Sequence, residues 1–588
     1  MKKSLALLLT AALLCGCATG PANSAASSET ASSIVSEKNL SPQDKDFNDF
    51  MHDYVVETCE LDYTTAHHYF EDPAKAGIDL SKCEITLGTI LPDEQQEQFE
   101  DETLSRLKEF STQDLSKANK QLCEQLLWEN DLALRQSDSR FNYLDNIWSE
   151  MSGTQTAIPD FFTEYQLFGE SDLEPLIELI NDVPRYTDEA IAYTKEQAKR
   201  GLLSFDYEAT IEKIDEILDS KANSITLSEL EAEIDTLDMS SSKKSEWKNK
   251  VREAMDESFF PSFEKMKSAL AEVEDQNQPL SGLASHDNGA DYYALLLEYY
   301  CGGPVGDLED LQEELLDKLN ATLDDFQALQ EKNPKAALMG MSAKTDFTKV
   351  SDIMPFLDEH YAMKFPVLEA MDYEIKPLSK EQSNEGVLAY FVVPPIDSNR
   401  TYEIRYNAED YADDPSDLQL YDTFAHEGIP GHMYQTQYNK EHLSVAQHFQ
   451  DSMGFQEGYA TYAAWHMLDD AGVDPDILES WKLNSLYTNY LAMIMDIDIN
   501  GFGMSQDEFA EVYGEALEPL YNQLAQNPGI FFAYYYGFDQ FETFFNETKE
   551  ELGDKFDEPA FNNALLEAGT VKFSIVEENL QEYIDSVK

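Results

Sequence analysis

Basic residues are scarce in this chain. Its 588 residues include 41 Lys and Arg against 114 Asp and Glu, which gives a formal net charge of −73 at pH 7. A charge of this sign and size repels nucleic acid and anionic lipid surfaces at long range, so the composition argues against a nucleic-acid-binding protein. The acidic residues are spread along the sequence rather than gathered in one tail, which is typical of a solvated acidic surface.

Cysteine is also rare. Beyond the N-terminal segment the chain has four cysteines: Cys59, Cys83, Cys123 and Cys301. Their spacing matches no zinc-knuckle pattern, which argues against a structural zinc module of that kind. In an oxidising compartment they permit two disulfides with three alternative pairings. Buried free thiols are the other interpretation, because a chain of this length does not need cross-links.

Long apolar runs are absent except at the N-terminus. There Lys2 and Lys3 precede the apolar residues 5–14, a pattern typical of a secretion signal and too short to cross a bilayer. The run ends in Leu-Cys-Gly followed by Cys17, which resembles a bacterial lipobox and predicts cleavage after Gly16 and lipidation of Cys17. The alternative is an ordinary signal peptide with a chance cysteine. The lipobox predicts a protein of the cell envelope, outside the cytoplasm, anchored to the membrane only through its N-terminal lipid.

The sequence therefore divides into four expected regions. Residues 1–16 are the lipoprotein signal peptide, and residues 17–40, rich in Ser, Ala and Thr, are the lipidated cysteine and a flexible tether. The remaining chain exceeds what one core usually organises, so two lobes or one large helical body are both plausible. The Pro and Gly residues of 277–289 favour a boundary there. They predict an N-terminal helical lobe over 41–280 and a catalytic lobe over 281–588.

Helical periodicity dominates the mature chain and predicts a mainly α fold. After Asp307, which can cap a helix, apolar residues recur at spacings of three and four: Leu308, Leu311, Leu315, Leu319, Leu323 and Phe326. Residues 121–134 and 207–218 show similar patterns. No internal repeat of fixed period is present.

One segment departs from this pattern. Residues 387–393 form an apolar, β-branched run, followed by Pro394-Pro395, a polar turn at residues 397–399 and a second strand-like run over 401–406. The pattern predicts a β-hairpin, or two strands joined by a loop, shortly before the candidate catalytic helix. Its edge could bind an extended peptide as an added strand, or the hairpin could simply cover the core.

The residues from His426 to His432 carry the most specific chemistry. Zinc peptidases need two neutral imidazoles, a third ligand and a carboxylate that deprotonates the metal-bound water, and HExxH is their common spacing. Here Glu427 follows His426, but the histidines are six residues apart, which on an unbroken helix places them about 120° apart. Pro430 and its flanking glycines interrupt the helix. We therefore expect a broken turn that brings both imidazoles to one point.

The third ligand is expected downstream. Residues 454–463 predict a largely apolar helix with Glu457 near its start. A carboxylate in such surroundings needs a cation, and a zinc ion would satisfy it.

These segments resemble the bacterial domain of unknown function 885 family, which looks like a divergent branch of the zincin-type metallopeptidases. The family motif HEG-x-PGHH is similar to residues 426–433, with Met433 in place of the last histidine, and EGWALYAE is similar to residues 457–464. The segment PGQALSY-x-x-G is echoed by residues 528–537. Residues 288–293 and the hairpin ending at Asn407 are weaker echoes, so the resemblance spans nearly the whole mature chain.

Two further segments depart from the family pattern. Where relatives show R-x-x-x-D-x-G-x-H, this chain has Ala492, Asp496 and Asn500. Tyr459 stands in place of a tryptophan, and Ala464 replaces a final glutamate. These changes spare the expected ligands and bear on substrate preference.

The resemblance implies a multi-helix, zincin-like body with a small sheet near the catalytic helix. It implies that His426, His432 and Glu457 bind Zn²⁺ and that Glu427 is the general base. Tyr534 aligns with the family's tyrosine and is a candidate for polarising the scissile carbonyl or stabilising its oxyanion, although packing also explains a tyrosine within Tyr-Tyr-Tyr.

The function implied is a zinc metallopeptidase that cleaves short peptides outside the cytoplasmic membrane, by Glu-assisted attack of zinc-bound water. Two other classes stay open. One is a metal-dependent hydrolase of another amide, such as a cell-wall crosslink, and the other is an inactive peptide-binding lipoprotein.

Overall fold

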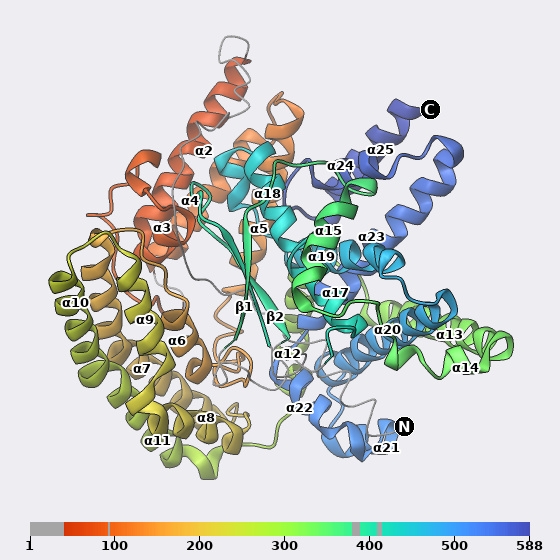
Figure 1. The fold of residues 1–588 in the computed structure, drawn as a ribbon. Coiled ribbons are helices and arrows are strands. Elements are labelled where there is room, and N and C mark those ends of the chain that lie inside the picture. Colours follow the sequence, from red (N-terminus) through yellow and green to blue (C-terminus); the bar gives the residue numbers. More distant parts are fainter. Residues whose placement is uncertain (1–39, 92–93, 379–387, 408–413) are drawn as a thin grey trace.

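Amphipathic helices make up most of this computed structural model, which describes residues 40–91, 94–378, 388–407 and 414–588. The expected signal peptide, Cys17 and the tether as far as residue 39 lie outside the described residues, as does Val387. Within the described ranges the chain forms a mainly helical body with one small sheet (Figure 1). No described helix is both long enough and apolar enough to span a membrane.

The described residues of the N-terminal part form helices that are joined by loops and short turns. Its helices include α2 (Pro42–Leu61), α3 (Tyr63–Tyr69), α4 (Glu94–Phe110), α5 (Lys117–Gln136), α6 (Thr154–Thr163), α7 (Leu173–Arg200), α8 (Tyr207–Asp219), α9 (Ile225–Thr236), α10 (Ser241–Ala254) and α11 (Phe260–Val273). A hydrophobic core formed by residues between Tyr63 and Val273 holds most of these helices together. The side-by-side packing of α7 to α11 is visible in Figure 1.

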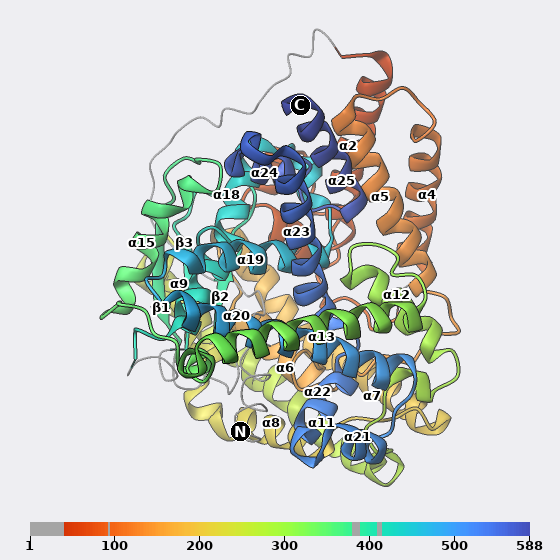
Figure 2. The same ribbon diagram turned by 90° about the vertical axis from the view of Figure 1, so that its right-hand side faces the viewer.

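The C-terminal part contributes the remaining helices and the sheet. Its helices include α12 (Gly289–Tyr300), α13 (Leu308–Lys332), α14 (Pro334–Ala337), α15 (Ile353–His360), α17 (Leu418–Glu427), α18 (His432–His442), α19 (Met453–Met467), α20 (Pro475–Asp496), α21 (Gln506–Tyr513), α22 (Glu518–Gln526), α23 (Ile530–Leu552), α24 (Glu558–Leu566) and α25 (Phe573–Val587). The turned view shows α13 lying along α20 (Figure 2). The proposed boundary near residue 280 stays a prediction.

Helix α13 shows how the sequence determines one of these elements. Asp307 caps it by accepting a hydrogen bond from the Glu309 backbone amide, and Leu311, Leu315 and Leu319 are buried as their spacing predicts. Leu323 was expected on the same face but is 46% exposed. The buried stripe drifts around the helix, because spacings of four residues exceed the 3.6 residues of one turn.

The sheet confirms the expected pair of strands and adds a third. Strand β2 (Ala389–Val392) pairs antiparallel with β3 (Tyr402–Tyr406), and β1 (Tyr373–Pro377) pairs parallel with β3 on its other side. The strand order β1-β3-β2 therefore makes β2 an edge strand. All four β2 residues are buried: Phe391 packs in the core that includes residues of α17 and α19, and Tyr390 and Val392 pack with Leu378.

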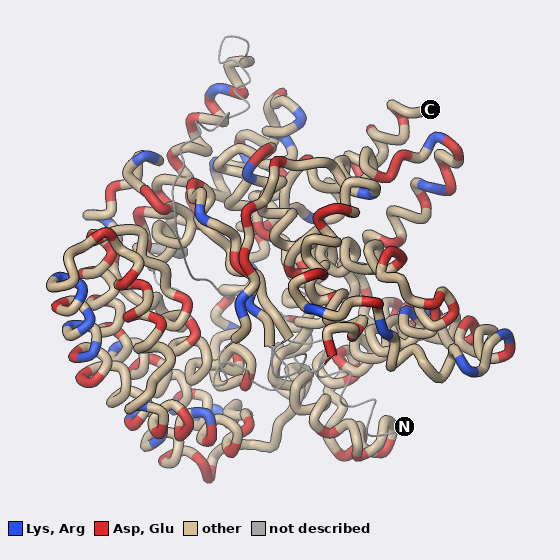
Figure 3. The backbone as a smooth tube through the Cα atoms, viewed as in Figure 1, with Lys and Arg blue, Asp and Glu red and all other residues tan. Residues whose placement is uncertain are grey.

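The four cysteines of the described chain are free thiols. Cys59, Cys123 and Cys301 are buried, and the Cys83 thiol donates a hydrogen bond to the Cys59 carbonyl oxygen at 3.2 Å. Acidic residues are spread over the helices rather than gathered in one region (Figure 3).

Candidate metal centre

The segment between His426 and His432 breaks one helix into two. Helix α17 ends at Glu427 and α18 begins at His432, with a cis peptide bond between Ile429 and Pro430 in the connection. Two backbone hydrogen bonds cross the break, from the Gly431 amide to the Ala425 carbonyl (2.9 Å) and from the Tyr434 amide to the Gly428 carbonyl (3.1 Å). Each spans six residues, which is also the separation of the two histidines. The expected broken turn is therefore present.

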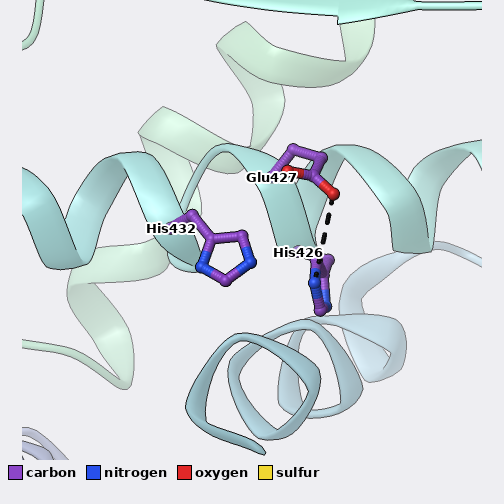
Figure 4. Close-up of side chains that lie close together, drawn as sticks. All are labelled: His426, Glu427 and His432. Atoms are coloured by element: carbon purple, nitrogen blue, oxygen red, sulfur yellow. Dashed lines mark ion pairs between the residues drawn. The ribbon is translucent and has the colours of Figure 1, made fainter. Parts of the chain in front are cut away.

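Gly431 allows the two helix ends to approach. A Cβ atom at this position would lie 1.8 Å from the His426 carbonyl oxygen, far inside any van der Waals contact. Only glycine fits there, and the close approach places the two imidazole rings 4.7 Å apart between centroids, at an interplanar angle of 88°. Figure 4 shows both rings on the same side of the broken helix.

Helix α19 brings Glu457 to the histidines. It packs against α23 at a glycine contact, where a Cβ on Gly458 would lie 2.4 Å from the Gly537 carbonyl carbon and a Cβ on Gly537 would lie 2.1 Å from the Gly454 carbonyl oxygen. Backbone therefore meets backbone at this crossing. Gly458 directly follows Glu457, and Gly537 lies three residues after Tyr534, so the contact holds both site residues close to the crossing point of the helices.

Three predicted ligand atoms converge. Glu457 Oε2 lies 3.5 Å from His426 Nε2 and 3.3 Å from His432 Nε2. The side chains are almost fully shielded from solvent, with exposed fractions of 8% for His426, 3% for His432 and 1% for Glu457. One nitrogen of each histidine and one Glu427 oxygen also lie within 4.8 Å of one another.

The polar atoms at this point fit a divalent cation. Within the described part of the chain, His426 Nε2, His432 Nε2, Glu457 Oε2 and Glu427 Oε1 are buried without a hydrogen-bond partner. Such atoms are costly to bury unpaired, and imidazole nitrogens with a carboxylate oxygen are the donor set that zinc takes in catalytic sites. Burial alone would raise the pKa of the Glu457 carboxyl group, but the nearby His432 and His426 outweigh this effect and lower the pKa to about 2.

Glu427 differs from Glu457 in its surroundings. Its Oε2 accepts a hydrogen bond from the Phe391 backbone amide of β2 at 3.0 Å, and its Oε1 lies 4.0 Å from His426 Nε2. One oxygen is thus held by the sheet while the other faces the histidines, an ion pair drawn in Figure 4. Glu457 is better placed to be the third ligand, and Glu427 to act beside it.

Tyr534 lies next to His426. The two rings are stacked with centroids 6.3 Å apart and an interplanar angle of 19°, and Tyr534 reaches this place from α23. The Thr461 hydroxyl oxygen lies 3.5 Å from His426 Nδ1. Thr461 can therefore orient the ring whose other nitrogen points to Glu457.

A cavity of about 130 Å³ opens beside these residues, between α17, α19, α20 and α23. Its lining includes His426, Tyr534 and the carboxylate-bearing Asp422, whose pKa burial raises to about 6 against the opposing influence of His426 and Lys482. A larger hollow of about 540 Å³ lies in the N-terminal part, lined by residues such as Asp219 and Phe260. It contains none of the predicted site residues.

Sequence reasoning missed three contributors to this region: Asp422, Thr461 and the Phe391 amide. The first two carried a usable signal. Asp422 lies four residues before His426 and Thr461 four residues after Glu457, so helical periodicity places both on the faces that carry the ligands. The role of Phe391 carried none, because a backbone amide has no side-chain signature.

A search with family models matches residues 88–580 to the family described as "Bacterial protein of unknown function (DUF885)". The match covers most of the sequence. The chain belongs to the DUF885 family. A search of curated proteins finds no match for it.

Two solved structures resemble this DUF885 chain. The "putative lipoprotein" from Colwellia psychrerythraea has a TM-score of 0.78 and 14% identity, over 92% of this chain and 99% of that one. The "putative lipoprotein of unknown function" from Shewanella oneidensis has a TM-score of 0.55 and 15% identity, over 84% of this chain and 94% of that one. At these identities the likeness shows a shared fold.

The weaker DUF885 segments meet at one buried carboxylate. Asp496 accepts hydrogen bonds from the Tyr293 hydroxyl (2.8 Å), the Asn500 side-chain amide (2.9 Å) and the Gly529 backbone amide (2.9 Å). Tyr293 and Gly529 belong to the segments 288–293 and 528–537 that resemble the family, whereas Asn500 lies in the segment 492–500 that departs from its pattern. The segments therefore build a structural junction that ties α12, the end of α20 and the start of α23 together.

Proposed function

We propose that this chain is a zinc-dependent hydrolase of the peptidase type. One observation carries the proposal: Nε2 of His426, Nε2 of His432 and Oε2 of Glu457 meet at a buried point without hydrogen-bond partners among the described residues. Two imidazoles and one carboxylate, with a second carboxylate alongside, are the composition of catalytic zinc sites in peptidases. A structural zinc site would fill its fourth position with another side chain.

A bound zinc ion would supply Lewis acidity, which makes water nucleophilic near neutral pH and polarises an amide carbonyl. The protein residues supply the rest. Glu427 Oε1 has no hydrogen-bond partner in the described chain and can accept a proton from the attacking water, then return it to the leaving amine. The Phe391 amide holds the other oxygen, so the carboxylate keeps its direction during both transfers.

Tyr534 would assist from the cavity side. Its ring stacks beside His426, and it lines the cavity next to which the carbonyl of a substrate would lie. A phenolic hydroxyl at this place can donate to the negative oxygen that develops during amide hydrolysis. The small cavity favours short peptides as substrates. The Phe391 amide on the edge of β2 already donates a hydrogen bond to Glu427. Addition of a peptide strand to this edge stays a prediction.

The place of action that we propose is the outer side of the cytoplasmic membrane. The lipobox ending in Cys17 supports a lipid anchor, and the two structural neighbours are themselves described as putative lipoproteins. Substrates would then be peptides of the cell envelope rather than cytoplasmic proteins.

Digestion of a peptide library tests the proposal. The purified protein is loaded with one equivalent of zinc, and products are identified by mass spectrometry with and without a chelator. Chelator-sensitive cleavage of peptides is the expected result. Cleavage of peptidoglycan fragments alone would instead favour a cell-wall amidase. Bound zinc without hydrolysis of any amide would contradict the enzymatic proposal and favour a binding lipoprotein.

A further inference from the structure

The cavity beside His426 presents hydrogen-bond acceptors. This inference rests on the proposed function, because the cavity shares His426 and Tyr534 with the candidate metal centre. Its volume of about 130 Å³ is roughly ten times the smallest void that holds one water, which suits a single side chain or terminal group.

Asp422 is the charged acceptor of this cavity. Its Oδ2 accepts a long hydrogen bond of 3.5 Å from the Gln419 side-chain amide. Among the residues that the structure describes, no Lys, Arg or His nitrogen lies within 4.0 Å of the Asp422 carboxylate, since no such ion pair occurs. The nearby Lys482 is paired instead with Asp469 at 2.9 Å. The nearest protein cations therefore act on Asp422 only from beyond ion-pair distance, and a cation bound in the cavity could approach the carboxylate more closely.

Two side chains of α20 add neutral acceptors. The Asn484 amide nitrogen donates to the Ser480 carbonyl at 2.6 Å, which leaves its Oδ1 as the atom able to accept. The Thr488 hydroxyl donates to the Asn484 carbonyl at 2.8 Å, so its oxygen can accept but has no further proton to give. Both residues line the cavity. A ligand with several N–H donors would complement this arrangement.

Aromatic rings form the walls. Trp465 and Trp481 line the cavity with ring centroids 6.3 Å apart, and Phe538 lies 5.0 Å from Trp465. Indole faces attract cations as well as apolar stems. A cavity with one carboxylate, neutral acceptors and indole walls is suited to an aliphatic chain that ends in a positive charge.

We propose that this cavity binds a protonated amine or guanidinium of the peptide substrate, with Asp422 as its counter-ion. Two parts of a peptide carry this chemistry, namely a Lys or Arg side chain and a free N-terminus. The candidate metal centre would then cut an amide at a fixed distance from the positive group. The high negative charge of the whole protein would also concentrate such peptides around it.

Four matched peptides separate the two sources. One has an acetylated N-terminus and a lysine, the second has norleucine in place of that lysine, and the other two repeat this pair with a free N-terminus. If the acetylated lysine peptide is cleaved faster than the acetylated norleucine peptide, the cavity binds a basic side chain. If the norleucine peptide with a free N-terminus is cleaved faster than the acetylated norleucine peptide, the cavity binds the terminal ammonium. Equal kcat/KM for all four peptides overturns the proposal.

The variant Asp422→Asn tests the counter-ion. We expect its kcat/KM for the preferred cationic peptide to fall roughly 10- to 100-fold, with little change for the acetylated norleucine peptide. Asp422→Glu, which keeps the charge, should restore part of the preference. Asp507→Asn removes the same charge from an exposed position on α21 and should leave the preference unchanged. Thermal melting checks that each variant is folded.

Other results separate this proposal from the one on which it rests. An equal loss on all four peptides, or a loss of bound zinc in Asp422→Asn, would mean that Asp422 acts through His426, and would overturn the cavity assignment. If the wild-type protein cleaves no peptide, the proposed function fails. Calorimetric titration of zinc-loaded Glu427→Gln with the same four peptides then decides the cavity by itself. Tighter binding of cationic peptides supports the assignment, and equal binding overturns it.

Discussion

Two buried glutamates lie beside the paired histidines, and their different contacts are the basis of the separate roles that we propose for them. Glu457 has an oxygen within 3.5 Å of both imidazoles, whereas Glu427 is held by a backbone amide and faces the histidines with its second oxygen. Removing the Glu427 carboxylate should therefore affect the rate of hydrolysis, and removing the Glu457 carboxylate should affect metal binding. This difference provides two tests at the scale of single residues.

Glu427→Gln should abolish proton transfer while leaving zinc in place. General acid–base groups typically contribute 10² to 10⁴-fold to rate, so kcat should fall by roughly that factor while the zinc content stays near one equivalent. Peptide turnover and elemental analysis measure the two quantities. Full activity in this variant would contradict the assignment of Glu427 as the base.

Glu457→Gln should weaken zinc binding. The neutral amide lacks the charge that offsets the cation, so affinity should fall by at least roughly 100-fold, beyond the loss typical of residues that only orient a ligand. Competition with a fluorescent zinc chelator measures the dissociation constant. Gln456→Ala, which changes the preceding residue of α19, is the matched control. Unchanged affinity in Glu457→Gln would exclude it as a ligand.

Residue identity and spacing predicted the convergence of His426, His432 and Glu457, because few arrangements explain a buried glutamate downstream of two histidines. The Phe391 contact to Glu427 could not be predicted in the same way. It depends on a long-range approach between β2 and α17, and backbone amides are chemically alike along the whole chain.

At the scale of elements, the crossing of α19 and α23 determines where Glu457 lies. Gly458→Ala would place a methyl group 2.4 Å from the Gly537 carbonyl carbon, so the helices must separate. We expect the free energy of unfolding to fall by about 1–3 kcal/mol and zinc affinity to fall with it. Chemical denaturation and zinc titration check both effects. Asn546→Ala on the exposed face of α23 should change neither.

The junction at Asp496 should make stability depend on pH. Burial raises the pKa of Asp496 to about 7, although three hydrogen-bond donors oppose this effect. A carboxyl group with a higher pKa in the folded protein holds its proton more tightly when folded. Its contribution to stability is therefore present below a pH of about 4 and is lost as the pH rises through about 7.

Asp496→Asn should flatten this dependence. Urea unfolding of both proteins at several pH values between about 5 and 8 measures how steeply the free energy of unfolding changes with pH. The difference in slope isolates Asp496, since other titrating groups are common to both proteins. Identical slopes would mean that the carboxylate ionises in the folded state as easily as in the unfolded one.

Helices and the β2–β3 pair were predictable because their signals are local, such as the cap at Asp307 and the turn at residues 397–399. Strand β1 was not predicted. It is five residues long and pairs in parallel with a strand 29 residues further along, so neither its length nor a nearby turn indicates it. The exposed Leu323 shows that a periodic pattern locates a helix more reliably than it locates the edge of the buried face.

At the scale of the whole molecule, the expected anchor would determine where the protein meets the substrates that we propose. Cys17→Ser should move the protein from the membrane fraction to the soluble fraction, because no lipid can then be attached. Detergent partitioning and mass spectrometry of the N-terminus measure the change. Cys15→Ala leaves the lipidated position intact and should keep the protein at the membrane. Retention of Cys17→Ser in the membrane fraction would contradict lipid anchoring at this residue.

The sheet gives Glu427 a mechanical link to the N-terminal helices. In β3, Arg405 lies 4.0 Å from Glu229 of α9, and just before β3 the Arg400 guanidinium donates to the Leu167 carbonyl at 2.8 Å. Strand β3 pairs with β2, whose Phe391 amide aims the carboxylate. Helix α9 and the backbone amide that holds Glu427 are therefore joined through a single strand pair, so the N-terminal helices contribute to the support of the candidate metal centre.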